Sequence, residues 1–247
     1  DYYFAYNKMS ENIEKNSFFS RGKSLVVGMS ERHFRMKKIK NIINSSCPPI
    51  VYISTNLYKG NLGYFVGWST DYDRSLNEKN LITNVFSRLP HKIRYKTYPE
   101  HNRRYVDKDP AIECANKYNN IELFEKKIDM RFLLQQHQIV VTSSATSTIG
   151  WPVMANKPTV FINWDTHDSL SEEAYISFSN GLFLFDANSE YFHENLRKFL
   201  SKPISEITKL WNKKEVARKD MIQRFFSEYS SGAGKRGHRL ITTEYFS

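Results

Sequence analysis

Residues 138–162 read QIVVTSSATSTIGWPVMANKPTVFI, and this stretch determines the fold class that the sequence predicts. An apolar run, Gln138–Thr142, passes into small hydroxyl residues; a helical pattern, Ser147–Ala155, and a second β-branched run, Thr159–Ile162, follow. This order is typical of parallel strands joined by a crossover helix, because a tight turn cannot connect a parallel pair. The stretch therefore predicts an α/β protein with a parallel sheet.

The same alternation of short apolar runs and amphipathic helical patterns extends over most of the chain. The expected strands are Ile50–Ser54, Lys92–Lys96, Asn120–Leu123, Gln138–Thr142, Thr159–Ile162 and Leu182–Phe185. The expected helices between them are Asn77–Arg88, Ile128–Gln136, Ser147–Ala155, Glu172–Phe178 and Glu190–Leu200. We therefore expect a Rossmann-like, doubly wound parallel sheet over residues 50–202, with helical N- and C-terminal extensions.

The paired prolines Pro48 and Pro49 mark the start of this domain, because proline continues neither a helix nor a strand ladder. The pattern before them predicts a helix, a short strand and a basic helix over Asp1–Phe19, Ser24–Val27 and Glu31–Ile43. Since about fifty residues are too few for another α/β domain, residues 1–49 are interpreted as a linker to, or a remnant of, a neighbouring domain. The start at Asp1 favours a piece of a longer protein, and residues 203–247 predict C-terminal helices.

The composition narrows the class of protein. With 36 Lys and Arg against 26 Asp and Glu, the formal net charge of +10 predicts affinity for anions such as nucleotide phosphates, acidic sugars, nucleic acid or anionic lipid. A hydrophobic share of 40% excludes global disorder, and no apolar run approaches the roughly 20 residues that span a bilayer. The two cysteines, Cys47 and Cys114, lack metal-ligand spacing, which excludes a disulfide scaffold and a zinc cluster and favours a soluble protein of a reducing compartment.

The loop after the fourth expected strand is the strongest candidate for a ligand site. In an open parallel sheet, ligands bind beyond the carboxyl ends of the strands. Six of the seven residues from Thr142 to Thr148 carry hydroxyl groups, and hydroxyls together with the free N–H groups of a helix start suit a phosphate. An ordinary N-cap turn is the alternative interpretation. The candidate phosphate ligands are Ser143, Ser144, Thr146 and Ser147.

Two further strand ends supply candidates. The first expected strand ends in Ser54, Thr55 and Asn56, for which a plain mobile loop is an equally good interpretation. The second ends in a basic and aromatic loop, where the alternative is a solvated basic surface. Its candidate anion ligands are Lys96, Tyr98, Arg103 and Arg104, and its candidate catalytic or phosphate-binding histidine is His101.

These loops together resemble the C-terminal, donor-binding domain of GT-B glycosyltransferases, and more narrowly the bacterial capsule and lipopolysaccharide transferases that use CMP-Kdo. The family's R-x-H-P loop, T-x-x-S-S/T loop and G-K-P-V strand start correspond to Arg94–Pro99, Val141–Thr148 and Ala155–Val160. The similarity spans about Ile50–Leu200, and its motifs are short. It departs where Tyr98 stands in place of the family histidine. A second departure is the region of the family's ribose-binding glutamate, which Trp151 and Pro152 occupy here.

The resemblance implies a glycosyltransferase that needs neither metal nor cofactor and moves Kdo or another acidic sugar from a CMP-activated donor to a surface glycan or its lipid-linked precursor. Ser143, Ser144 and Thr146 would hold the donor phosphate, while Lys96, Arg103 or Arg104 would offset its charge. The catalytic base is expected chiefly from an acceptor-side domain. The candidates within this chain are His101 and Asp165. The polar loop that holds Asp165 is expected near the ligand, where Asp165 or Glu173 is placed to touch a sugar hydroxyl.

Two alternatives stay open. One is a UDP-sugar-dependent transferase or epimerase of the same fold, although an epimerase would need a set of acidic and histidine residues that the sequence does not reveal. The other is a non-catalytic basic module that binds membrane or nucleic acid, for which the basic stretches Lys37–Lys40 and Lys213–Lys219 argue. Nucleic acid is the less expected partner. The expected location is cytoplasmic and peripheral on the inner face of the cytoplasmic membrane.

Overall fold

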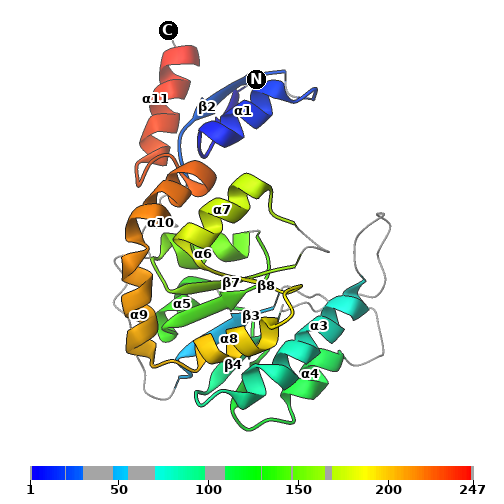
Figure 1. Ribbon diagram of the computed structural model, residues 1–247. Helices are drawn as coiled ribbons and strands as arrows, with labels where there is room; N and C mark the ends of the chain where they lie inside the picture. Colours follow the sequence, from blue (N-terminus) through cyan, green and yellow to red (C-terminus); the bar gives the residue numbers. More distant parts are fainter. Residues whose placement is uncertain are drawn as a thin grey trace.

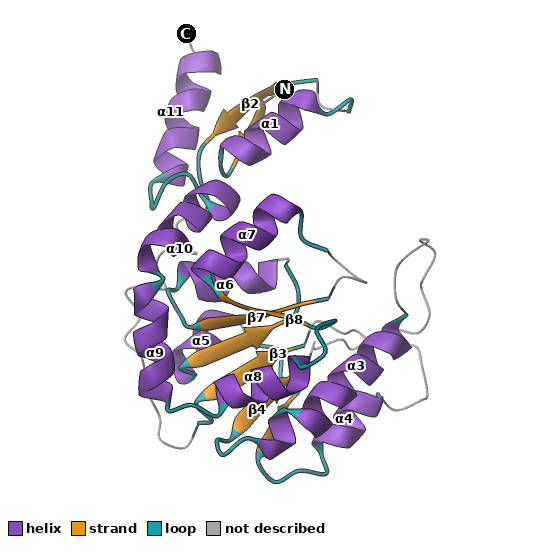
Figure 2. Ribbon diagram, in the orientation of Figure 1, coloured by secondary structure: helices purple, strands orange, loops and turns teal. Residues whose placement is uncertain are grey.

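The computed structural model describes residues 2–19, 21–29, 47–54, 70–97, 109–128, 130–145, 147–164 and 169–245. Its centre is a parallel sheet of order β5-β4-β3-β6-β7-β8 (Figures 1 and 2). The strands are β3 (Ile50–Ile53), β4 (Ile93–Lys96), β5 (Ile121–Phe124), β6 (Ile139–Thr142), β7 (Thr159–Asn163) and β8 (Phe183–Asp186). Counted within the sheet, this order is 3-2-1-4-5-6, so the expected Rossmann-like, doubly wound sheet is confirmed.

Helices cover both faces of this sheet (Figure 2). Helices α3 (Asp71–Asn84), α4 (Pro110–Ala115) and α8 (Phe192–Leu200) lie on one face, and α5 (Met130–Gln136) and α6 (Ser147–Met154) lie on the other. Helix α3 begins before the expected residue 77 because Thr70 and Asp73 form a capping box at its start. Helix α4 was not expected, and it begins at Pro110 directly after the N-cap Asp109.

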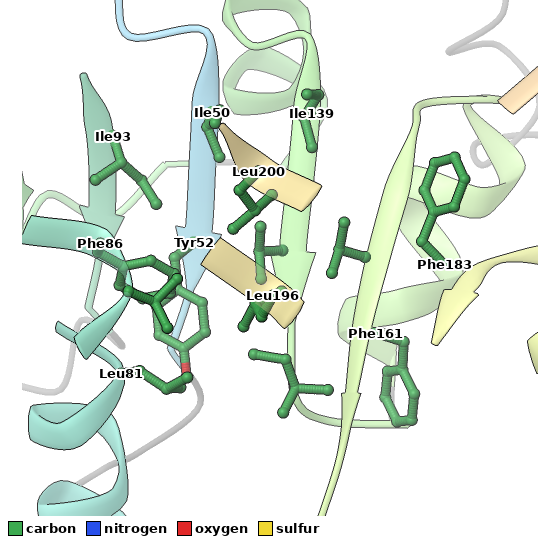
Figure 3. Close-up of a cluster of buried hydrophobic side chains, with 14 of the residues drawn as sticks. Ile50, Tyr52, Leu81, Phe86, Ile93, Ile139, Phe161, Phe183, Leu196 and Leu200 are labelled. Carbon is green, nitrogen blue, oxygen red and sulfur yellow. The ribbon is translucent and has the colours of Figure 1, made fainter. Parts of the chain in front are cut away.

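The core follows the alternation of side chains along the strands. Leu196 and Leu200 of α8 lie over Ile50 of β3 and Ile139 of β6, and all four side chains are fully buried (Figure 3). On the opposite face Val51 and its neighbours pack against α5 and α6. Strands β3 and β6 are therefore held by packing on both faces of the sheet.

The N-terminal residues correct one expectation. Residues 2–19 form β1 (Tyr2–Ala5) and then α1 (Lys8–Asn16) rather than a single helix, and β2 (Lys23–Val26) pairs with β1 in parallel. The local pattern did not reveal β1 because this strand is stabilised by hydrogen bonds to β2, on the other side of α1. The expected basic helix over residues 31–43 lies outside the described residues.

The C-terminal residues form α9 (Ile204–Lys213), α10 (Glu215–Met221), a π-helical turn η3 (Ile222–Phe226) and α11 (Ala233–Tyr245). Helix α11 and the turn before it hold the β1-α1-β2 unit, which lies beside them in Figure 1. The Arg236 Nε donates a hydrogen bond of 2.9 Å to the Val27 carbonyl, and the Glu228 N–H donates one of 3.0 Å to the Tyr6 carbonyl. The two ends of the described chain are thus joined directly.

Cys47 and Cys114 are both free thiols. In the part of the chain that the structure describes, no cluster of three or more His, Cys, Asp or Glu side chains is arranged to hold a metal ion. No described helix combines the length and the apolar character that a membrane span requires.

Candidate functional site

The two central strands define the site. Strands β3 and β6 are neighbours, but the chain leaves β3 toward β4 on one side and leaves β6 toward β7 on the other. The connections therefore diverge at the carboxyl ends of β3 and β6, and this topological switch point is the usual ligand position in a sheet of this kind. Ile53 lies opposite Thr142 in the register, so Ser54 and Ser143 continue from neighbouring positions. We call Ser54, Ser143 and Ser144 the switch-point serines.

The two serines after β6 stand just before a helix. Ser144 is buried, Ser143 is partly exposed, and the Ser144 N–H lies 3.5 Å from the Thr142 Oγ1. Helix α6 begins at Ser147, and the first N–H groups of a helix have no acceptor within it and carry partial positive charge. The structure thus brings the expected Ser143 and Ser144 together with Ser54 at one edge. Thr146 and the side chain of Ser147 lie outside the described residues.

A buried carboxylate lies behind these serines. The Ser54 Oγ donates to the Glu78 carboxylate at 2.8 and 2.9 Å, and the Tyr52 hydroxyl donates to its Oε1 at 2.8 Å. The Tyr95 hydroxyl donates to Oε2. Glu78 lies on α3 and is 6% exposed, so three hydroxyl groups from β3, the end of β3 and β4 replace water around it.

The electrostatics of Glu78 are those of a carboxyl that titrates near neutrality. Burial raises its pKa to about 7, hydrogen bonds from Tyr95, Ser54 and Tyr52 act in the opposite direction, and the Asp109 carboxylate adds repulsion. Asp109 in turn accepts hydrogen bonds from the Ser75 hydroxyl and the Ala111 N–H. In the described part of the chain, no Lys or Arg forms an ion pair with Glu78.

The network around Glu78 extends to Ser143 through one further contact. The Tyr52 hydroxyl lies 3.4 Å from the Ser143 Oγ, and burial raises the pKa of Tyr52 well above its ordinary value. Tyr52 is therefore protonated throughout the physiological range and carries a single hydroxyl proton. It links the carboxylate on α3 to a serine at the switch point.

Sequence reasoning missed Glu78, although a signal was present. Glu78 lies three and four positions before Leu81 and Ile82, so it falls on the apolar stripe of α3. Tyr52 and Tyr95 occupy paired positions in β3 and β4 and therefore share a face of the sheet. A carboxylate on a buried stripe opposite two tyrosines indicates a hydrogen-bonded core group.

The basic loop after β4 is described only at its start. Lys96 is buried, its Nζ donates to the Thr97 carbonyl at 2.6 Å, and burial lowers its pKa to about 8. Tyr95 is turned into the core and is not available to stack on a base. The remaining expected ligands and catalytic candidates of these loops lie outside the described residues: Thr55, Asn56, Tyr98, His101, Arg103, Arg104 and Asp165.

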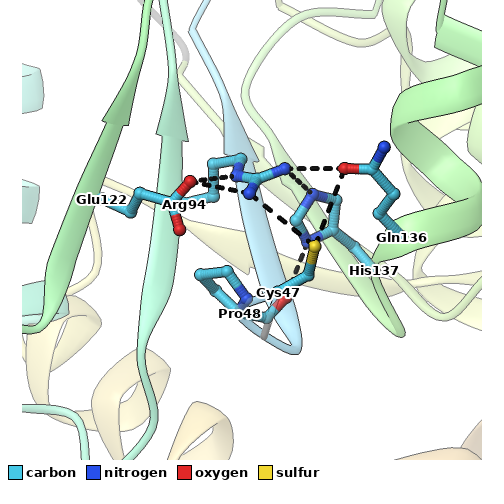
Figure 4. A network of polar contacts seen from close by, with 6 residues as sticks. All are labelled: Cys47, Pro48, Arg94, Glu122, Gln136 and His137. Carbon is cyan, nitrogen blue, oxygen red and sulfur yellow. Dashed lines mark hydrogen bonds and ion pairs between the residues drawn. The ribbon is translucent and has the colours of Figure 1, made fainter. Parts of the chain in front are cut away.

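A second polar network lies on the other face of the sheet, toward the start of the strands (Figure 4). The Arg94 Nη2 lies 2.6 Å from the Glu122 Oε1, and its Nη1 lies 2.8 Å from the Gln136 Oε1 and 3.2 Å from the His137 Nε2. Since a guanidinium only donates, the His137 Nε2 must accept, and the Nδ1–H donates to the Pro48 carbonyl at 2.6 Å. Burial lowers the pKa of His137 to about 4, so this histidine is neutral and structural.

No protein-family model and no curated protein matches the sequence, but solved structures with a similar fold do. The wall teichoic acid polymerase TagF superimposes with a TM-score of 0.53 at 14% identity, over 99% of this chain and 58% of its own. MurG from Acinetobacter baumannii gives 0.51 at 12% identity, over 91% and 58%. The spinosyn forosaminyltransferase SpnP gives 0.50 at 13%, over 90% and 51%.

These similarities describe a fold. All three identities are low, and the chain spans somewhat more than half the length of the structures it resembles. Together with the strand order, they show a Rossmann-like half of the GT-B fold.

Proposed function

We propose that this chain contains the nucleotide-binding half of a glycosyltransferase, and that the donor phosphates bind at the switch-point serines. The observation that carries the proposal is the position of Ser54 and Ser143–Ser144 on the two diverging strands of a 3-2-1-4-5-6 sheet, directly before the N-terminus of α6. An anion at this position meets the hydroxyl and N–H groups of Ser143 and Ser144 and the positive end of a helix, whereas the Ser54 hydroxyl donates to Glu78.

The chemistry follows from these donors. Transfer of a sugar from a nucleotide leaves negative charge on the departing phosphate, and N–H and O–H donors held at this position stabilise that charge. We therefore propose a transferase that uses no metal and no cofactor. The base that activates the acceptor is assigned to no described residue of this chain.

The donor and acceptor are proposed from similarity. The resemblance to capsule and lipopolysaccharide transferases favours a CMP-activated acidic sugar such as Kdo and a bacterial surface glycan or its lipid-linked precursor. A TagF structure soaked with CDPG also superimposes on this chain, with a TM-score of 0.52 at 13% identity, over 99% of this chain and 58% of its own. We therefore propose to test cytidine nucleotides first as donors, with uridine nucleotides as the comparison.

Calorimetric titration with CMP, CDP and UDP tests the proposal. The wild-type protein is expected to bind at least one of them, and Ser143→Ala/Ser144→Ala is expected to weaken binding at least tenfold because two donors to the phosphate are lost. The matched control is Ser230→Ala/Ser231→Ala, an exposed serine pair far along the chain, which should bind like the wild type.

Two results would contradict this site. Absence of binding by the wild type at millimolar nucleotide would remove the donor-site proposal altogether. Unchanged affinity of the double variant would move the phosphate elsewhere. Incubation with a UDP-sugar, followed by analysis of the sugar, separates transfer from epimerisation.

A second candidate activity is peripheral binding to an anionic membrane, and a different surface supports it. Phe18 and Phe19 follow α1 and are 92% and 89% exposed, and the basic residues Lys15, Arg21 and Lys23 are exposed beside them in the sequence. Aromatic rings flanked by cations suit the interface of an acidic bilayer, where the rings enter the headgroup region and the cations meet the phosphates.

Co-sedimentation with phosphatidylglycerol vesicles tests this second activity. Binding is expected at low salt, and Phe18→Ser/Phe19→Ser should reduce it severalfold, whereas Tyr72→Ser/Tyr191→Ser removes two exposed rings elsewhere and should not. Equal binding by both double variants would exclude the Phe18–Phe19 surface. Binding to oligonucleotides instead of vesicles would favour the nucleic-acid alternative.

A further inference from the structure

The protonation state of Glu78 determines in which direction the hydroxyl groups of Tyr52 and Ser143 donate their protons. When Glu78 is ionised it only accepts, and it receives the protons of Tyr52, Tyr95 and Ser54. Tyr52 has one proton, which is then directed to Glu78. The contact of 3.4 Å between Tyr52 and Ser143 is then a hydrogen bond only with the serine as the donor.

This arrangement turns the Ser143 hydroxyl away from a phosphate. With its proton directed at the Tyr52 oxygen, Ser143 presents lone pairs to an anion at the carboxyl edge of the sheet. A phosphate oxygen is itself an acceptor, so it meets the wrong side of this hydroxyl group. The ionised state of Glu78 thus removes one anion donor from the switch point.

One added proton reverses the chain of hydrogen bonds. A protonated Glu78 donates to the Tyr52 oxygen across the same 2.8 Å contact. Tyr52 then turns its own proton to the Ser143 Oγ, and Ser143 is able to donate outward. No bond between heavy atoms changes: one proton enters from solvent, and each hydroxyl keeps its own.

We propose that anion binding at Ser143 is coupled to protonation of Glu78 through Tyr52, which makes Glu78 a positioning residue for the donor phosphate. This inference rests on the proposed function, because it assumes that a nucleotide phosphate binds at the switch-point serines. It adds a residue and a proton that the loop motifs do not indicate.

The surroundings of Glu78 place this coupling in the neutral range. Tyr52 from β3 and Tyr95 from β4 face the carboxylate, and Asp109 before α4 repels its ionised form. Burial has already raised the pKa of Glu78 to about 7, so a modest further preference for the protonated state is enough to take up a proton when the anion binds. The wrong orientation of Ser143 supplies that preference.

The expected size of the effect follows from the protonated fraction. If only protein with protonated Glu78 binds well, the apparent Kd rises by the inverse of that fraction. For a pKa of about 7, the fraction falls from about 0.9 at pH 6.0 to about 0.03 at pH 8.5, so the Kd should rise about 30-fold over this interval.

Calorimetric titration with CDP-glucose and UDP-glucose measures this effect, because the phosphates of both compounds stay ionised from pH 5 to pH 9 and add no titration of their own. Wild-type protein is expected to bind more weakly as the pH rises and, at pH 7, to take up a fraction of a proton. That uptake appears as a dependence of the binding heat on the ionisation heat of the buffer. Glu78→Gln, which has a side-chain N–H₂ at every pH, should bind with an affinity nearly independent of pH.

Two further variants keep the test sharp. Tyr52→Phe cuts the path to Ser143 and should also flatten the pH profile, which guards against a Glu78→Gln protein that fails to fold. Glu194→Gln, at an exposed position on α8, should keep the wild-type profile.

The outcomes separate this inference from the proposed function. Binding by the wild type with a flat pH profile, or a steep profile that survives in Glu78→Gln or Tyr52→Phe, overturns the coupling and leaves the donor site standing. No binding by the wild type at any pH overturns the donor site, and the coupling falls with it.

Discussion

The buried carboxyl of Glu78 should make the folded protein less stable as the pH rises, and Glu78→Gln should remove that loss. The unfolded chain loses the proton of this group around its ordinary pKa of 4.5, whereas the folded protein holds it to about 7. Between these values the folded state binds more protons than the unfolded state, so the free energy of unfolding falls with increasing pH. The total loss is about 3 kcal/mol, since each pKa unit corresponds to about 1.4 kcal/mol.

The part of this loss that an experiment can follow lies between pH 6.0 and pH 8.5. At pH 6.0 the unfolded state is already ionised, and by pH 8.5 the folded state is too, which leaves a decrease of about 1.4 kcal/mol from Glu78 alone. Urea unfolding of wild type and Glu78→Gln at both pH values gives this figure as a difference of differences, in which other titrating groups cancel. Glu194→Gln is the matched control and should retain the wild-type change.

An equal change in wild type and Glu78→Gln would refute the reasoning. It would mean that Glu78 has nearly the same pKa in the folded and unfolded states, and therefore that water reaches it. The proton count that links Glu78 to Ser143 would then lose its basis, because a solvated carboxylate does not require the protons of Tyr52 and Ser54.

Two further predictions concern packing and the second polar network. Gly181→Ala should destabilise the protein by about 1–3 kcal/mol, because the new Cβ would lie 3.2 Å from the Arg218 Cα on the neighbouring helix. At Gly234 in α11 an added Cβ meets no atom within 4 Å, so Gly234→Ala should instead stabilise the protein by roughly 0.5 kcal/mol. Thermal unfolding should therefore show a lower midpoint for Gly181→Ala and a higher one for Gly234→Ala. Midpoints that change in the same direction would contradict this account of the packing. His137 is neutral in the folded protein, where its pKa is about 4 against an ordinary 6.5. It therefore contributes stability above pH 6.5 that is lost as the pH falls. The free energy of unfolding should decrease by about 2 kcal/mol between pH 7 and pH 5 because of this group. His137→Asn should lessen that loss in urea unfolding, whereas the exposed His238→Asn should not; the same loss in both variants would argue against a buried neutral imidazole.

The six-stranded sheet could be predicted because each of its strands has a recognisable apolar pattern within its own few residues. The runs Ile50–Ser54 and Gln138–Thr142 are apolar on both faces, as strands of a covered parallel sheet must be, and every expected strand end lies within one residue of the observed one. Strand β1 and helix α4 escaped prediction for opposite reasons. Strand β1 depends on its distant partner β2, and the six-residue α4 is too short to show a period.

The site divides in the same way. Ser143 and Ser144 could be placed at the carboxyl edge from their position after a strand, because the rule for ligand sites in parallel sheets needs only the order of elements. The role of Glu78 could not, because it depends on hydroxyl groups that come from β3 and β4 and meet only in the folded sheet. A single-sequence pattern records that a carboxylate is on a buried stripe, but it does not record which groups will be there to receive it.

The contact between Arg236 and Val27 joins residues that are 209 positions apart, and this has a consequence for biosynthesis. At ribosomal rates of roughly 5–20 residues per second, β2 emerges about 10–40 s before the helix that covers it. During that interval the central sheet can already form, while β1 and β2 still lack the contacts with α11. This segment is made early and completed late, so a chaperone would have that whole interval in which to bind it.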